Sequence, residues 1–337
     1  MDSNHRNFGG LKAWFPVLAL SLAIAAPSAY AEDPAKPDFE ATSGLGLRYG
    51  GASAFVYDRG RKLSELDWDI KPLVSIDSSA RLSIGHFVSD FAVSMGLPLS
   101  SGLITDSDWQ NAPLGDTTTK TNYSVSAAAI GHYFDVGLLF GYDFPIGGKL
   151  SLAPEIGFRY CDIAWSAEGG WLQYADNGSN ASPPYNSWTT GAKSPIYGLV
   201  STYGQVYAGF LLGLRAHWAP STVFSLEGQV DAAPILVAIA VDNHVFRNVT
   251  FSDIFLGGYL VEPLVTATYS PHPDWALKAR LGWTLIGGLV GDDIMTGSSG
   301  VDPALEGLNP GQSQTFVNAA GAALSALRLG FSASFQP

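Results

Sequence analysis

Period-two alternation of apolar and polar side chains is the feature of this sequence that most restricts its fold. In the segment ALRLGFSASF, Leu327, Leu329 and Phe331 share one face of an extended chain, while Arg328 and Ser332 share the other. Successive side chains of a strand point to opposite faces, so this pattern predicts a strand. Beyond the first 31 residues we find no helical periodicity of any length. We therefore predict an all-β protein.

The connections between the predicted strands alternate in length. Ten strands can be placed, at residues 42–57, 63–76, 79–96, 121–145, 149–169, 196–217, 223–241, 252–270, 274–289 and 316–335. The tight connections DSS, PIGG, APST and SPHP occupy every second position, and longer connections lie between them. Membrane barrels have short periplasmic turns on one rim and longer external loops on the other. This predicts a ten-stranded antiparallel up-and-down transmembrane β-barrel with long extracellular loops.

The N-terminal segment has the pattern of a secretory signal. Arg6 and Lys12 precede the apolar run AWFPVLALSLAIAA, and small residues at Ala29 and Ala31 follow it. We expect a signal peptide at residues 1–31 and a single barrel domain at residues 32–337. An N-terminal anchor helix is the alternative, but the apolar run is short and contains a proline.

Composition excludes several classes of protein. The net charge of −12 argues against nucleic-acid binding and favours cationic partners. A single cysteine, Cys161, excludes an intramolecular disulfide and a cysteine zinc cluster. A soluble β-sandwich remains an alternative, against which strand length and turn alternation count. A pore is disfavoured because side chains nearly fill a narrow ten-stranded barrel.

Two carboxylates stand two residues apart in GLITDSDWQN, which we place in the third, long connection. In an extended chain, Asp106 and Asp108 point to the same side. When two carboxylates lie close together, repulsion raises the pKa of one of them, which suits proton transfer. The competing interpretation is an ordinary polar loop.

A carboxylate and an imidazole have the same spacing at the end of the apolar run ILVAIA. Asp242 and His244 are expected on the same rim as the first pair. A carboxylate beside histidine fixes the tautomer and raises the histidine pKa. Each pair alone is a weak signal. Facing each other across the mouth of a barrel, the two pairs would hold a water molecule, from which His244 would take a proton.

These motifs resemble those of the omptins, outer-membrane endopeptidases of Gram-negative bacteria. The resemblance rests on RKLSELDW (61–68), TDSDW (105–109), NY (122–123), AEGG (167–170) and VDNH (241–244), in family order. It implies catalytic roles for Asp106, Asp108, Asp242 and His244, a water nucleophile and no metal. It also implies peptide or protein substrates and an active site facing outside the bacterial cell. The acidic charge of the chain would attract cationic peptides.

The sequence departs from the family at the specificity pocket. Members that cleave between basic residues carry an acid two positions before the Asp-His pair, where this chain has Ala240. The second acid comes from the first strand, which here reads GGASAFVY. Dibasic specificity is therefore in doubt, although Asp58, Glu65 or Asp69 could supply charge instead.

The sequence also departs from the family's lipopolysaccharide-binding patch. In GFRYCDIAW, Asp162 occupies the position of the family's arginine. Arg159 lies three residues earlier, so its side chain points to the opposite face of the strand. We therefore expect an activity whose dependence on lipopolysaccharide is altered or lost. The altered pocket leaves a second hypothesis open, a catalytically silent barrel that serves as an adhesin or receptor.

The remaining candidate residues are interpreted as structural. Four histidines stand isolated in strands and turns: His86, His132, His217 and His272. Asp292 and Asp293, in GDDIM, are expected in a solvated loop. The three acids and His244 could in principle bind a divalent cation, but the resemblance implies a metal-free mechanism.

Overall fold

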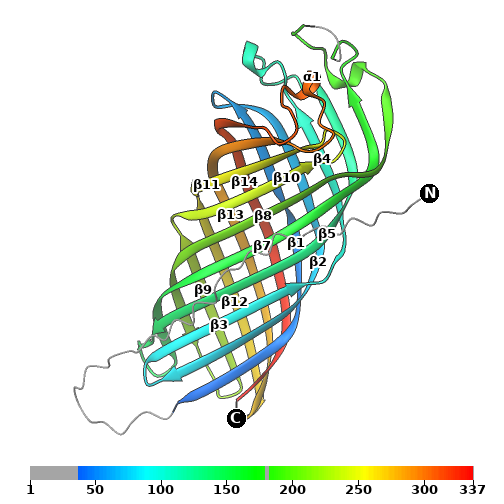
Figure 1. Cartoon of the computed structure of the whole chain (residues 1–337). Helices are drawn as coiled ribbons and strands as arrows, with labels where there is room; N and C mark the ends of the chain where they lie inside the picture. The colour runs from blue at the N-terminus through cyan, green and yellow to red at the C-terminus, as the bar shows by residue number, and fades with distance from the viewer. Residues whose placement is uncertain (1–36, 179–181, 337) are drawn as a thin grey trace. The chain divides into compact units, whose positions relative to one another are not determined.

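A single antiparallel sheet of fourteen strands forms the barrel (Figure 1). The computed structural model describes residues 37–178 and 182–336, and the expected signal peptide at 1–31 lies outside them. The strands are β1 (Asp38–Asp58), β2 (Arg61–Ile84), β3 (Phe87–Gly96), β4 (Leu99–Asp108), β5 (Asn122–Tyr142), β6 (Phe144–Pro145), β7 (Leu150–Tyr174), β8 (Lys193–Trp218), β9 (Phe224–Ala233), β10 (Leu236–His244), β11 (Val249–Gly257), β12 (Tyr259–His272), β13 (Trp275–Gly297) and β14 (Ser313–Phe335). Three one-turn helices lie in the connections: η1 (Ala112–Leu114), η2 (Trp188–Thr190) and α1 (Pro303–Glu306). None of the helices in the described ranges has the length and apolarity to cross a membrane.

The sheet closes on itself, as the alternation pattern predicted. Going round the wall, β8, β9, β12, β13, β14, β1, β2, β3, β5 and β7 are neighbours, and β7 pairs with β8 to complete the ring. Every pairing is antiparallel. The first and last long strands pair from Ala41↔Phe335 to Val56↔Ala320. Apart from the two-residue β6, which pairs with β7 alone, each strand of the described residues therefore has a backbone partner on both sides.

The number of strands differs from the ten that the sequence predicted, although the architecture is confirmed. Three places in the wall hold two successive strands each: β3 with β4, β9 with β10, and β11 with β12. β3 and β4 both pair with β2 and β5. β9 and β10 both pair with β8, β11 and β12 both pair with β13, and between these two couples β9 pairs with β12 and β10 with β11. The two-residue β6 follows β5 and, like it, pairs with β7. The fourteen strands therefore occupy ten places in the ring.

The tight turn expected at DSS is wrong. β2 runs through this segment, and the turn lies after Ile84 instead. Asp77 faces the lumen, where its carboxylate accepts a hydrogen bond from Arg328 at 2.8 Å. Polar residues that face a polar lumen thus resembled turn residues. The third connection is shorter than expected for the same reason, and β4 carries Asp106 and Asp108 on a strand rather than in a loop.

The barrel has two different ends. Three longer connections, residues 109–121, 175–192 and 298–312, lie at one end together with the turns 59–60 and 245–248. This long-loop end is the end at which α1 appears in Figure 1. Shorter connections and the C-terminus lie at the other. The end of β4 and the end of β10 both point to the long-loop end.

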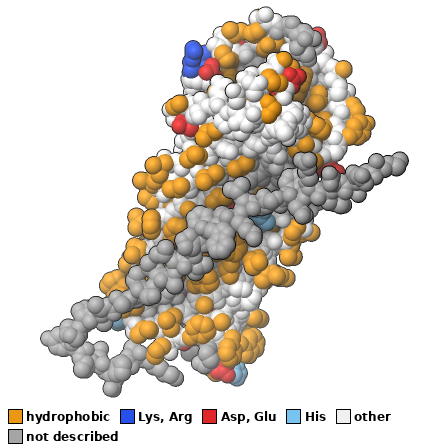
Figure 2. Space-filling model, viewed as in Figure 1, with side chains coloured by type: hydrophobic (Ala, Val, Ile, Leu, Met, Phe, Trp, Pro, Cys, Tyr) orange, Lys and Arg blue, Asp and Glu red, His pale blue; other side chains and the backbone are white. Residues whose placement is uncertain are grey.

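The outer wall is apolar along most of its length and charged near the long-loop end (Figure 2). On β2, Ile76, Leu82 and Ile84 are exposed on the outer face. Closer to the long-loop end the same face carries Asp67 and Lys71 instead. This change marks the upper limit of the apolar band that suits a lipid bilayer.

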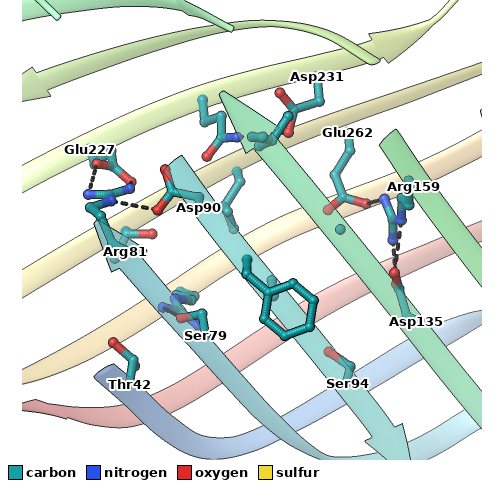
Figure 3. Close-up of a pocket in the computed structure, with 18 of the residues that line it drawn as sticks. Thr42, Ser79, Arg81, Asp90, Ser94, Asp135, Arg159, Glu227, Asp231 and Glu262 are labelled. Atoms are coloured by element: carbon teal, nitrogen blue, oxygen red, sulfur yellow. Dashed lines mark hydrogen bonds and ion pairs between the residues drawn. The ribbon is translucent and has the colours of Figure 1, made fainter. Parts of the chain in front are cut away.

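Ion pairs fill the lumen behind this apolar band (Figure 3). Arg81 contacts Asp90 at 2.6 Å and Glu227 at 2.9 Å. A second triad places Arg159 between Asp135, at 2.6 Å, and Glu262. Buried charges of this kind require partners, because leaving one unpaired costs several kcal/mol.

An aromatic layer separates these ion pairs from the long-loop end. Trp68, Trp165 and Tyr203 are buried, and their ring centroids lie 5.4 to 6.0 Å apart. On their strands all three lie nearer the long-loop end than Arg81 and Arg159 do. The layer therefore forms the floor of the space above it.

We predict that Arg159→Met destabilises the barrel by about 3–5 kcal/mol, since it leaves two buried carboxylates without their cation. Denaturant unfolding of refolded protein in micelles measures the change. The control is Arg59→Ala, whose side chain is 93% exposed and should matter by less than about 0.5 kcal/mol. Equal stability of the two variants would contradict a structural role for the lumen charges.

Candidate active site

A cavity of about 660 Å³ lies at the long-loop end, above Tyr203. Segments from around the wall line it: β1 and β2, β4, β10 with the turn that follows it, β11, β13 and β14. The four residues singled out from the sequence all line this cavity: Asp106, Asp108, Asp242 and His244. The structure thus brings together side chains that are more than 130 positions apart in the chain.

The first pair is held by the sheet on both sides. Asp106 and Asp108 lie on β4, which pairs with β2 and β5. The Asn122 side-chain amide donates to Asp108 Oδ2 at 3.0 Å, and the Ser64 hydroxyl donates to Asp106 Oδ1 at 3.3 Å. Period-two geometry turns both carboxyl groups into the cavity. Their positions are therefore set by backbone pairing rather than by a loop.

The second pair ends β10. The Ser201 hydroxyl donates to Asp242 Oδ1 at 2.5 Å, and Asp242 Oδ2 lies 2.9 Å from His244 Nε2. The Phe251 ring packs edge-on against the imidazole, with centroids 5.2 Å apart. Asp242 is 8% exposed, so its carboxylate is fixed by these contacts. If Nε2 donates to Asp242, the other ring nitrogen, Nδ1, is left to accept a proton.

The two pairs come from opposite walls of the barrel. Going round the ring from β10 to β4, one passes β8, β7 and β5 in one direction and five wall places in the other. The two pairs act electrostatically on each other, since the charge of His244 lowers the pKa of Asp106 and the charge of Asp106 raises that of His244. Asp67 of β2 lies on the outer face beside β4, next to the level of Asp106 in the wall. Asp106 and Asp108 therefore lie beyond the apolar band of the outer wall.

The environment raises three pKa values in the pairs. Burial, and then the neighbouring charge of Asp108, raises the pKa of Asp106 to about 8. Burial also raises the pKa of Asp108, against the hydrogen bonds from Ser64 and Asn122. For His244, burial disfavours the charged form, but the Asp242 carboxylate outweighs it and the pKa is raised. A carboxylic acid and a histidine, each with a raised pKa, thus lie in one cavity.

Several residues of the site were not identified from the sequence. Ser64 and Ser201 carry no motif that distinguishes them, and only the strand register places them beside the aspartates. The solvated loop expected for Asp293 is wrong, since this residue is 5% exposed on β13 and lines the cavity. Strand register, which the sequence does not display, brings Asp293 to the cavity.

The other candidates lie elsewhere, with one exception. Asp58 lines the cavity, whereas Glu65 pairs with Lys62 and Asp69 pairs with Lys71. None of the four isolated histidines lines it: His86, His132, His217 and His272. In the part of the chain that the structure describes, no group of three or more His, Cys, Asp or Glu residues is arranged to hold a metal ion.

Comparisons with known proteins agree with the fold. The crystal structure of the outer membrane protease OmpT from Escherichia coli superimposes with a TM-score of 0.79, over 93% of this chain and 100% of that chain, at 16% sequence identity. A plasminogen activator of Yersinia pestis is 22% identical over 258 residues, which are 74% of this chain and 76% of that protein.

A family model matches the chain as well. The sequence model of the Omptin family matches residues 35–325, nearly the whole described barrel. The chain therefore belongs to the omptin family of outer-membrane proteases.

Proposed function

We propose that this chain is an endopeptidase in which His244 activates a water molecule for attack on a peptide bond. One observation carries the proposal: the Asp106–Asp108 pair and the Asp242–His244 pair line one cavity from opposite walls. The cavity between them, about 660 Å³, has the size of an ordinary ligand pocket. Sheet pairing holds both pairs, as preorganised catalysis requires.

Asp242 and His244 form the proton-accepting half of the proposed reaction. Asp242 orients the imidazole and stabilises its charged form. His244 takes a proton from water as the water oxygen attacks the carbonyl carbon, and the carbonyl electron pair moves onto oxygen. The protonated His244 then gives this proton to the leaving amine, so the C–N bond breaks and a carboxylic acid and an amine are released.

Asp106 and Asp108 form the half that holds water and stabilises charge. With a pKa of about 8, Asp106 keeps its proton at neutral pH and can donate a hydrogen bond to the developing oxyanion. Asp108 is fixed by Asn122 and is placed to accept a hydrogen bond from the water. Two carboxyl groups with different environments can thus take different roles.

The cavity is strongly acidic, which favours cationic substrates. Besides the four proposed catalytic residues, Asp58, Asp253 and Asp293 line it, while Arg247 is the basic residue among its lining. Arg247 is bound to Glu306 at 2.6 Å. We propose that the barrel lies in the bacterial outer membrane with this cavity facing outside, since long loops are external in such barrels.

We predict that His244→Ala lowers kcat/KM for peptide cleavage by about 100- to 10,000-fold, because the general base is lost. Cleavage of a mixed peptide library by refolded protein measures it. His132→Ala is the matched control, since His132 also lies 2.8 Å from an aspartate, Asp162, but outside the cavity. Cleavage retained in the first variant would contradict the role of His244. A folded wild type that cuts nothing would favour the adhesin or receptor hypothesis.

The raised pKa values predict a bell-shaped dependence of kcat/KM on pH. The rate rises as His244 loses its proton, above its ordinary pKa of 6.5, and falls near pH 8 as Asp106 loses its own. In Asp106→Asn the basic limb should disappear while the acidic limb remains. A wild-type rate that is flat from pH 6 to pH 9 would contradict the assignment.

We further propose that activity does not depend on lipopolysaccharide bound at the fifth predicted strand, residues 149–169. Arg159 faces the lumen, where it pairs with Asp135. Asp162, which faces outward, is hydrogen-bonded to His132. Titration of detergent-refolded protein with lipopolysaccharide should leave the rate unchanged. Several-fold activation would show that a cofactor role survives without that arginine.

A further inference from the structure

Among the described residues that line the acidic cavity, Arg247 alone carries a permanent positive charge. It lies three positions after His244, in the turn 245–248 that follows β10. Its charge acts on both proposed catalytic pairs, since it favours the ionised form of Asp108 and opposes the charged form of His244. A guanidinium near buried carboxylates is attracted to them. The contact that holds Arg247 in its present place therefore bears on the proposed reaction.

That contact is a bidentate ion pair with Glu306. Nε of Arg247 donates to Glu306 Oε1 at 2.9 Å, and Nη2 donates to Oε2 at 2.6 Å. Among the described residues this is the only ion pair that Arg247 makes. Glu306 does not line the cavity, whereas Arg247 does. Because a bidentate pair fixes the guanidinium plane, Glu306 holds the charged end of Arg247 at the rim.

The segment DPALEG supports Glu306 from below. Asp302 is the N-cap of α1, and its side chain accepts a hydrogen bond from the Ala304 N–H at 2.9 Å. Gly307 ends the helix in the left-handed region, at φ = 70°, which glycine adopts without strain. Glu306 is thus the last residue of a capped turn, and its side chain is 10% exposed. Its position is set by the local backbone.

The loop 298–312 is also fastened to the turn that carries Arg247. The Ser298 N–H donates to the Asn248 carbonyl at 2.8 Å, and the Asn248 side-chain amide donates to the Gly300 carbonyl at 3.1 Å. A small apolar cluster joins the loop to β11 and β13: Val249, Met295, Val301 and Leu308. These contacts do not involve Arg247 or Glu306. The loop should therefore stay docked when either charge is removed.

The guanidinium has a second contact inside the cavity. It lies over the Phe251 ring, 5.4 Å from the centroid. The same ring packs edge-on against the His244 imidazole, with centroids 5.2 Å apart. A cation is attracted to the face of an aromatic ring, so this contact adds to the hold of Glu306. Arg247 is thus one ring away from the proposed general base.

We propose that Glu306 is a positioning residue that holds Arg247 at the rim, so that Asp108 stays free to hold the water that His244 activates. This inference rests on the proposed endopeptidase function. Without Glu306, Arg247 would turn into the cavity and pair with Asp108, whose charge acts on it more strongly than that of Asp242. A guanidinium bound there would take up the carboxylate oxygens and the place of the water. The site would then block itself.

The first test asks whether a second substitution repairs the first. Glu306→Gln keeps the size of the side chain but loses its charge, and it should lower kcat/KM for peptide cleavage at least about 10-fold by populating the blocked form. Adding Arg247→Gln should restore most of the lost rate, because no guanidinium is left to reach Asp108. A double variant as slow as Glu306→Gln, or a full rate in Glu306→Gln, would overturn the proposal.

The matched control neutralises a carboxylate in another ion pair of the long-loop end. Glu65→Gln breaks the pair with Lys62, and neither residue lines the cavity. This variant should leave kcat/KM unchanged. Equal losses in Glu65→Gln and Glu306→Gln would show a general response to lost surface charge and would contradict a positioning role.

The last test does not depend on catalysis. NMR titration of protein with isotope-labelled histidine follows His244, whose signal is the one missing from His244→Ala. Arg247 lowers the pKa of His244, so Arg247→Gln should raise it. The rise should be larger in the Glu306→Gln background than in wild type, because there Arg247 lies closer. The charged groups that face His244 come from β4, β10, β13, the turn and α1: Asp106, Asp108, Asp242, Asp293, Arg247 and Glu306.

The two measurements separate this inference from the proposed function. If wild type cuts no peptide but the rise is larger without Glu306, the hold on Arg247 stands and the proposed protease function fails. If peptides are cut but the two rises are equal, Arg247 does not move, and the positioning role fails while the protease function stands.

Discussion

Closure of the backbone ladder is the constraint on which the rest of this structure depends. A strand that crosses a bilayer must satisfy each backbone N–H and C=O within the protein, and β7–β8 pairing completes the ring that achieves this. Closure divides every strand into an outer and an inner face. The outer face then takes the apolar side chains, and the polar ones must share a narrow lumen. Both the ion pairs below the aromatic layer and the carboxyl groups above it follow from that division.

What distinguishes the two halves of the lumen is the supply of cations. Below the aromatic layer, carboxylates such as Asp135 and Glu262 share Arg159, and such triads hold the strands in place. Above it, Asp106 and Asp108 contact only neutral donors, Ser64 and Asn122. Carboxyl groups without a cation in a buried place keep their protons more tightly, and this makes them available for chemistry. The same residue type is therefore paired with a cation at one level and held by neutral donors at the next.

Much of the fold and the four proposed catalytic residues could be predicted from periodicity and short motifs. The alternation in residues 326–335 reports two faces of a strand, and spacing two apart places Asp242 and His244 on one side. The positions at which strands of the wall end or are broken could not be predicted. In the sequence, a bulge or a lumen-facing aspartate such as Asp77 gives the same signal as a turn. Ser201 and Asp293 were missed because register across strands, which the sequence does not display, brings them to the cavity.

The central claim is that the pairs from β4 and β10 act as one catalytic unit. The most direct measurement is kcat/KM for a cleaved peptide in Asp106→Asn, in His244→Ala and in the variant that carries both. Groups that act as a unit have strongly non-additive effects. We predict that the double variant is about as slow as the slower single variant. Losses that multiply, so that the double variant falls by the product of the two single effects, would show that the two walls act independently and would contradict the account.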